Sequence, residues 1–213
     1  MKKSILIMAV ALSAATVSAQ ESFKPEVGKV SIEVGFNPFS DYVITLPNQS
    51  LKAYYSLSDQ LSIRLGLGFD RDGTSYNSGN EGDKERTTSN TTFSIAPGAT
   101  YSLRETGRLI PYVGAEIVFA TTSNETAQGD YTVTNAPAGN PSTRFGLNVL
   151  TGINYYVAKN LYIGTEIALG YVSTSLKQSE TSSGGTTTKD KAESSSSNFG
   201  ISATPSLRLG WTF

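Results

Sequence analysis

The last sixteen residues, NFGISATPSLRLGWTF (198–213), alternate between apolar and polar side chains without a break. One set of positions reads Phe199, Ile201, Ala203, Pro205, Leu207, Leu209, Trp211 and Phe213, and the other reads Gly200, Ser202, Thr204, Ser206, Arg208 and Gly210. Because successive side chains of a β-strand point to opposite faces, the stretch predicts a strand with one apolar and one polar face.

The same alternation recurs along the chain and predicts eight strands. They span Val27 to Phe36, Ser50 to Leu57, Leu61 to Phe69, Thr91 to Leu103, Leu109 to Thr121, Arg144 to Val157, Leu161 to Ser173 and Asn198 to Phe213. Most reach the ~9 to 11 residues that a tilted membrane-spanning strand requires. The second strand is marginal and could begin nearer Val43, which leaves the register of residues 40–50 open.

The predicted connections alternate strictly between short and long. Residues 58–60, 104–108 and 158–160 are predicted tight turns, whereas Ser40 to Gln49, Asp70 to Asn90, Thr122 to Thr143 and Thr174 to Ser197 are predicted long polar loops. The last of these is so rich in Ser, Thr and Gly that we expect it to be mobile. Short turns at one end and long loops at the other are the rule for transmembrane barrels, and an even strand number places both termini at the turn end.

The polar faces of these strands are rich in Gly, Ser and Thr, and the apolar faces carry aromatic residues at two heights. Near the loop ends these are Phe36, Phe69, Phe93, Phe119, Phe145, Tyr171 and Phe199, and near the turn ends Tyr55, Tyr101, Tyr155, Trp211 and Phe213. Two such bands are expected at the two membrane interfaces. The prediction is therefore an all-β, eight-stranded antiparallel up-and-down transmembrane β-barrel. A soluble β-sandwich is the structural alternative, but it leaves the bands and the loop alternation unexplained.

The N-terminus has the three parts of a secretory signal: Lys2 and Lys3, an apolar run from Ile5 to Ala15, and small residues before Gln20. We expect a signal peptide over 1–19, cleaved near Ala19, and a single barrel domain over 20–213. Removal of Lys2 and Lys3 leaves 15 basic and 18 acidic side chains, a balance that gives no reason to expect a nucleic-acid partner. The chain has no Cys, hence neither disulfides nor a cysteine for lipid attachment.

Together, the signal peptide, the eight amphipathic strands, the alternating loops and the ending Leu207-Arg208-Leu209-Gly210-Trp211-Thr212-Phe213 resemble the small outer-membrane β-barrel family of the OmpA transmembrane-domain and OmpX type. This resemblance implies a bacterial outer-membrane location with both termini periplasmic. It also implies that Leu207, Leu209, Trp211 and Phe213 are the signal read by the barrel-assembly machinery during insertion. Outer-membrane lipid and lipopolysaccharide are the other expected partners, and a closed barrel needs no neighbour, so we expect a monomer.

Strand parity places six charged residues inside the barrel. Glu33, Glu116 and Glu166 are predicted to pair with Lys52, Arg64 and Arg208, since an unpaired ion at that depth is very costly. In one interpretation this network plugs a lumen that is only wide enough for side chains. In the other, the many inward glycines leave a file of water and the charges gate a small-solute or ion pore.

Catalytic, cofactor and metal sites are not predicted. The chain has no His, the commonest general acid–base, and no Ser lies at a defined spacing from a base on a predicted strand. Loop carboxylates at Asp70, Asp72, Glu81, Asp83 and Glu85 lack the third oxygen ligand and distant Glu of a calcium loop. We expect a non-enzymatic envelope protein that displays four surface loops, with a porin-like pore as the alternative and a loop-mediated adhesin or receptor as a third possibility.

Overall fold

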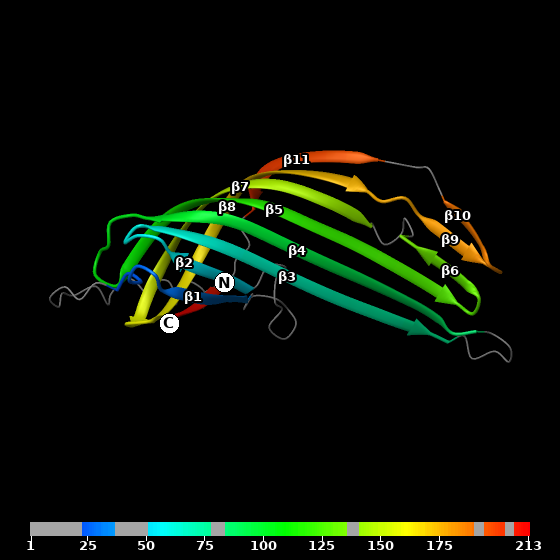
Figure 1. Cartoon of the computed structure of the whole chain (residues 1–213), viewed down its shortest axis with the longest axis horizontal. Coiled ribbons are helices and arrows are strands. Elements are labelled where there is room, and N and C mark those ends of the chain that lie inside the picture. Colours follow the sequence, from blue (N-terminus) through cyan, green and yellow to red (C-terminus); the bar gives the residue numbers. More distant parts are fainter. Residues whose placement is uncertain (1–22, 37–50, 78–83, 136–140, 190–193, 203–206) are drawn as a thin grey trace, which may run out of the picture.

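The computed structural model describes residues 23–36, 51–77, 84–135, 141–189, 194–202 and 207–213 (Figure 1). The predicted signal peptide and the uncertain register at 40–50 lie wholly outside these ranges. The described elements are all β-strands. The chain therefore folds as an all-β protein, as the alternating pattern predicts.

Eight strands close into a ring by antiparallel pairing of each strand with the next. They are β1 (Val30–Phe36), β2 (Leu51–Ser56), β3 (Leu61–Tyr76), β4 (Arg86–Ser102), β5 (Leu109–Gln128), β7 (Ser142–Ala158), β8 (Leu161–Leu176) and β12 (Leu207–Thr212). The pairing of β1 with β12, from Ser31 opposite Thr212 to Phe36 opposite Leu207, completes the ring. The predicted eight-stranded up-and-down barrel is confirmed.

The predicted last strand is divided between two elements. Its first part is β11 (Ser195–Ser202), which pairs with the loop-end half of β8, and its second part is β12, which pairs with the turn-end half. Both parts use the same neighbour, so they continue along one edge of β8. The side chains of residues 201–206, including the predicted outward Ile201, Ala203 and Pro205, lie outside the described residues.

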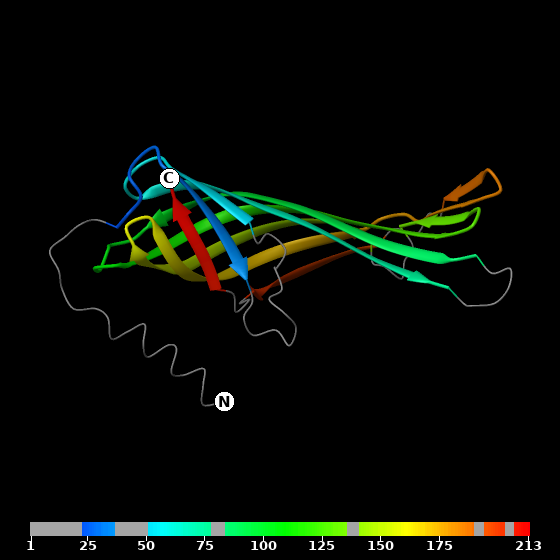
Figure 2. The ribbon, with the colours of Figure 1, turned by 90° about the horizontal axis from the view of Figure 1, so that it is seen from below.

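Three short connections gather at one end of the barrel, which we call the turn end; the opposite end is the loop end (Figure 2). The three connections join β2 to β3, β4 to β5 and β7 to β8. They coincide with the predicted tight turns at 58–60, 104–108 and 158–160. The alternation of short and long connections is thus confirmed where the chain is described.

The prediction that the long polar segments are loops is wrong over much of their described length, where the structure has strands. Strand β3 continues to Tyr76, β4 already begins at Arg86, and β5 continues to Gln128. All three strands therefore extend well beyond the barrel (Figure 1). Three further strands extend the same sheet: β6 (Tyr131–Thr134) pairs with β5 and with β9 (Glu180–Ser183), and β9 pairs with β10 (Thr186–Lys189). We call these extensions and β6, β9 and β10 the distal sheet.

Hydroxyl side chains hold the distal sheet where apolar residues are lacking. Thr88 pairs with Thr126 at 3.2 Å, and Thr92 with Thr122 at 3.1 Å. Thr is a good strand former, and cross-strand hydroxyl pairs stabilise a ladder without any apolar face. The strands therefore continue past the point at which the apolar alternation ends.

Apolar residues lie on the outside of the ring and polar residues on the inside. Along β12, Leu207, Leu209 and Trp211 are exposed, whereas Arg208, Gly210 and Thr212 are buried. Arg208 is only 2% exposed, and Trp211 is 50% exposed. This inversion of a soluble protein's pattern is that of a barrel whose outer surface meets lipid.

Exposed aromatic side chains form two bands on that outer surface. At the loop end, Phe69 lies opposite Phe93, Phe119 opposite Phe145, and Tyr171 opposite Phe199. At the turn end, exposed Tyr55, Tyr101, Trp211 and Phe213 make the second band, with Tyr155 half-buried. The side chain of Phe36, predicted in the first band, lies outside the described set.

Candidate functional site in the barrel interior

The strand register brings inward-pointing charges to one height in the barrel. Glu33 on β1 lies opposite Lys52 on β2, and Lys52 lies opposite Gly66 on β3. Further round the ring, Arg64 and Glu116 both lie opposite Gly98 on β4. Because the ring is closed, side chains from strands far apart in the chain reach the same central space.

Glu166, on β8, is the most heavily contacted member of this group. Its Oε1 lies 2.9 Å from Lys52 Nζ, and its Oε2 lies 2.7 Å from Arg64 Nη1. Tyr112 donates its hydroxyl to Glu166 Oε2 at 2.5 Å, and Arg208 Nη1 lies 3.8 Å from the same oxygen. One carboxylate therefore joins cations from β2, β3 and β12.

Glu33 and Arg208 make a second centre beside Glu166. Arg208 Nη1 donates to Glu33 Oε2 at 2.8 Å, and Tyr162 donates to the same oxygen at 3.0 Å. The other amino group, Arg208 Nη2, donates to the Asn154 side chain at 3.0 Å and to the Thr165 carbonyl at 2.9 Å. Glu33 and Arg208 are 1% and 2% exposed, so the pair is desolvated and satisfied by several partners, as a buried ion pair requires.

Glu116 completes the network on the β5 side. Its Oε2 lies 2.8 Å from Arg64 Nη2, and Asn148 donates its amide to Oε1 at 2.9 Å. All six predicted charges, Glu33, Lys52, Arg64, Glu116, Glu166 and Arg208, are thus linked by contacts of 4 Å or less. We call these six residues the charged layer. Three acids balance three bases, and the layer crosses the lumen.

Large inward side chains lie over glycines of neighbouring strands. A Cβ on Gly210 would overlap the ring of Tyr162, which lies opposite it on β8. A Cβ on Gly152 would lie 2.5 Å from the Tyr112 ring, and one on Gly164 would lie 2.7 Å from Arg208 Nη2. Tyr162, Tyr112 and Arg208 therefore cover these three glycines.

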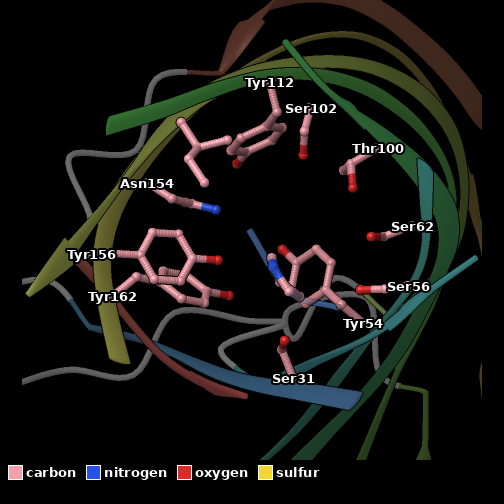
Figure 3. A pocket seen from close by; sticks show the side chains of 12 residues that line it. Ser31, Tyr54, Ser56, Ser62, Thr100, Ser102, Tyr112, Asn154, Tyr156 and Tyr162 are labelled. Carbon is pink, nitrogen blue, oxygen red and sulfur yellow. The ribbon is translucent and has the colours of Figure 1, made fainter. Parts of the chain in front are cut away.

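A ring of hydroxyl groups lies between the charged layer and the turn end. Figure 3 shows Tyr54, Tyr112, Tyr156, Tyr162 and Asn154 converging on a space whose other wall is built from small hydroxyl residues. Those small residues are Ser31, Ser56, Ser62, Thr100 and Ser102. The volume of this space is about 40 Å³, enough for a few water molecules. We call this space the hydroxyl chamber.

Strand parity predicts inward positions not only for the six charged residues but also for Tyr54, Tyr112, Asn154 and Tyr156, which line the hydroxyl chamber. Tyr162 was not among the predicted inward residues, although it shares the parity of Gly164 and Glu166 on β8 and is 3% exposed. Ile110 is also 3% exposed, and the parity rule does not predict it inside because that rule assigns apolar side chains to the outer face. Phe23, which precedes the first strand and packs against Tyr156 and Ile110, has no strand pattern from which to predict it.

The four residues predicted as the assembly signal all lie on the outer surface. Leu207, Leu209, Trp211 and Phe213 are 39%, 46%, 50% and 62% exposed. The Phe213 amide donates to the Val30 carbonyl at 2.8 Å, which ties the chain end to β1. Their side chains are thus available to another molecule at the outer face of the ring.

Within the described ranges no three His, Cys, Asp or Glu side chains cluster as metal ligands. No helix of the described chain is long and apolar enough to span a membrane. Asp70 and Asp72 lie on β3 in the distal sheet, where Asp72 accepts from Asn90 at 3.4 Å.

Comparison with known families decides the classification. The sequence model of the OmpA-OmpF-like porin family matches residues 84–213, which is well over half of the chain. The chain belongs to this family. An OmpA-OmpF-like porin is an outer-membrane β-barrel, in agreement with the closed ring and its apolar exterior. The family match begins near the start of β4 and includes the Glu116, Glu166 and Arg208 members of the charged layer.

Two solved structures match the chain at low identity. The outer membrane protein OprG from Pseudomonas aeruginosa is 11% identical to this porin-family chain, with 91% of this chain and 99% of that chain covered and a TM-score of 0.48. The ferric yersiniabactin uptake receptor FyuA from Yersinia pestis is 12% identical over 90% of this chain and 44% of its own length, with a TM-score of 0.25. No match is found among curated proteins. Neither likeness is close enough to carry functional information.

Proposed function

We propose that this protein is a closed, non-enzymatic scaffold barrel of the outer membrane that holds the distal sheet at the cell surface. The observation that carries the proposal is the charged layer. Its six side chains cross the lumen and bond to one another, and Arg208 lies over Gly164 while Tyr112 and Tyr162 lie over Gly152 and Gly210. An eight-stranded ring is only wide enough for side chains to fill, so a filled layer leaves no continuous path.

The bonding of the interior carboxylates supports a structural role for the charged layer. Each acid of the charged layer is bonded to a cation, and the Tyr112 and Tyr162 hydroxyls donate to carboxylates. A general base needs access to a substrate proton, and a nucleophile needs an adjacent base. The carboxylates are instead engaged by side chains of the barrel, and the chain contains no His to relay protons.

The proposed orientation of the barrel and its partners rest on the family resemblance and on the even number of strands. The signal peptide over 1–19 directs export, and cleavage near Ala19 leaves the barrel domain over 20–213. The turn end faces the periplasm together with both termini, and the distal sheet faces outward among lipopolysaccharide. The barrel-assembly machinery reads Leu207, Leu209, Trp211 and Phe213 during insertion, and the inserted barrel is a monomer.

Planar-bilayer recording tests the closed state against the pore alternative. Protein extracted from outer membranes in detergent is first checked for a shift in gel mobility on boiling, which reports an intact barrel. We expect this protein to insert without discrete current steps. Reproducible openings that vanish after boiling would overturn the scaffold proposal in favour of an ion or small-solute pore lined by the charged layer.

A further inference from the structure

Residues Phe23, Lys24 and Pro25 lie across the turn end of the barrel, ahead of the first strand. The Phe23 ring packs on Tyr156 with centroids 6.3 Å apart, and Tyr156 packs on Tyr162 at 5.2 Å. The Arg108 guanidinium lies 5.2 Å above the Phe23 ring, and the Phe23 amide donates to Glu105 Oε1 at 2.8 Å. This segment is therefore held by the turn between β4 and β5 and by the end of β7.

A tight turn directs the segment to this place. The Lys29 amide donates to the Glu26 carbonyl at 3.2 Å, and Gly28 between them has a φ of +83°. A positive φ at the third position makes this a type II turn, which favours Gly because it has no Cβ to clash. The Gly28 amide also donates to the Ser56 carbonyl at 2.8 Å, which fixes the turn to the end of β2.

The segment separates two spaces. Pro25 lines the hydroxyl chamber, and it also lines an open groove of about 730 Å³ at the turn end, together with Phe23, Glu105 and Lys159. A residue that borders both spaces belongs to the wall between them. The wall at this point is made by the N-terminal segment rather than by a strand of the ring.

We propose that residues 23–25 form a stopper at the turn end, so that the lumen has two barriers in series: the stopper and the charged layer. The contacts that attach the stopper include one aromatic cluster, one stacked guanidinium and one amide hydrogen bond, whereas the strands around it are joined by continuous ladders. It is thus the part of the lumen wall that can be removed without breaking the ring. Its loss opens the hydroxyl chamber to the turn end but leaves the loop-end side closed by the charged layer.

The absence of Cys from the chain allows each side of the charged layer to carry a single thiol reporter. Ser56→Cys reports on the hydroxyl chamber, since Ser56 lines it and is 3% exposed. Ser94→Cys reports on the loop-end side, since inward-facing Ser94 is 2% exposed and lies four residues from Gly98 at the charged layer. Each reporter is treated with a small charged methanethiosulfonate in detergent, and the modification rate is measured.

Two independent changes release the stopper. Phe23→Ala removes the ring, with exposed Phe69→Ala as its control, and Arg108→Ala removes the stacked cation, with exposed Arg104→Ala of the same turn as its control. We expect Phe23→Ala to raise the Ser56→Cys rate at least about tenfold and Arg108→Ala to raise it by less, while the Ser94→Cys rate stays unchanged. The controls should leave both rates unchanged.

Two results overturn the proposal. One is a Ser56→Cys rate that neither Phe23→Ala nor Arg108→Ala raises above its control, because the segment would then not be the barrier. The other is a parallel rise at Ser56→Cys and Ser94→Cys, because the charged layer would then not be a second barrier. Retained gel-mobility shift on boiling shows that each variant is a folded barrel. Since bilayer current requires both barriers to open, the thiol rates test the stopper separately from the closed-scaffold proposal.

Discussion

The ring of Tyr162 occupies the space in which a side chain at position 210 would lie. Tyr162 on β8 and Gly210 on β12 are direct neighbours in the register, and a Cβ on Gly210 would overlap the ring. The same ring donates its hydroxyl to Glu33 at 3.0 Å. The absence of a side chain at Gly210 thus permits a hydrogen bond of the charged layer.

Gly210→Ala should therefore destabilise the barrel by displacing Tyr162. Overpacking of this kind costs about 1 to 3 kcal/mol. The measurement is the midpoint of urea unfolding in detergent, monitored by the fluorescence of Trp211, which is the only Trp of the chain. Gly73→Ala is the matched control, since the nearest atom to its Cβ would be the Thr88 carbonyl oxygen at an ordinary 3.7 Å. Equal midpoints for the two variants would contradict the contact.

Glu166→Gln should be among the most destabilising conservative changes in the chain. It leaves Lys52 and Arg64 without the carboxylate that both contact, and removal of one member of a buried ion pair costs about 3 to 5 kcal/mol. Glu180→Gln breaks an exposed pair with Lys189 and should cost at most about 1 kcal/mol. The same unfolding assay compares them, and similar losses would show that the charged layer is solvated.

Ile167→Arg tests the outer surface as a lipid contact. Ile167 is 48% exposed near the middle of β8, and an Arg facing lipid near the bilayer midplane costs about 2 to 4 kcal/mol. Leu176→Arg, at the loop end of the same strand and 42% exposed, should change stability by about 0.5 kcal/mol or less. Refolding yield into lipid vesicles and the unfolding midpoint measure both. A soluble protein would tolerate the two changes equally.

Phe213→Ser separates folding from assembly. The side chain is 62% exposed and the Phe213 amide bond to Val30 is kept, so refolding in detergent should be unchanged. In cells, we expect the amount of heat-modifiable protein in the outer membrane to fall severalfold, because the assembly signal is lost. Phe199→Ser is the control, at an aromatic of the loop-end band that is 71% exposed. A matching fall in that control would remove Phe213 from the signal.

The barrel itself was predictable because lipid enforces a strict rule on each strand. Every second residue of a spanning strand must be apolar, so Leu207, Leu209 and Trp211 reveal both the strand and its register. The same parity places Glu33, Glu166 and Arg208 inside, and the cost of a buried ion then predicts that they pair. The alternation rule thus predicts, for all residues of a spanning strand together, which side chains face lipid and which face the interior.

The distal sheet was not predictable by that rule because it lies beyond the lipid. Local turn chemistry does indicate one of its hairpins: Gly184 and Gly185, both with positive φ, join β9 to β10 as a two-residue turn. The prediction of a mobile loop over 174–197 rests on its low apolar content and does not use this Gly-Gly signal. The inward packing of Phe23 was not predictable for a different reason. Phe23 lies ahead of the first strand, and its partner Tyr156 comes next to it only when the ring closes.

The length of the distal sheet has a mechanical consequence. From Asp70 to Tyr76, β3 continues for seven paired residues past the Phe69 band, which is about 23 Å at the rise of a strand. An unpaired linker of that length would have an end-to-end distance of only about 15 Å and would sample every direction. Along this span β3 pairs with β4, and β4 pairs with β5, so the three strands form a stiff projection from the barrel. A peptide grafted between Tyr76 and Arg86 would therefore be held at a fixed distance from the bilayer, whereas a flexible linker would let that distance vary.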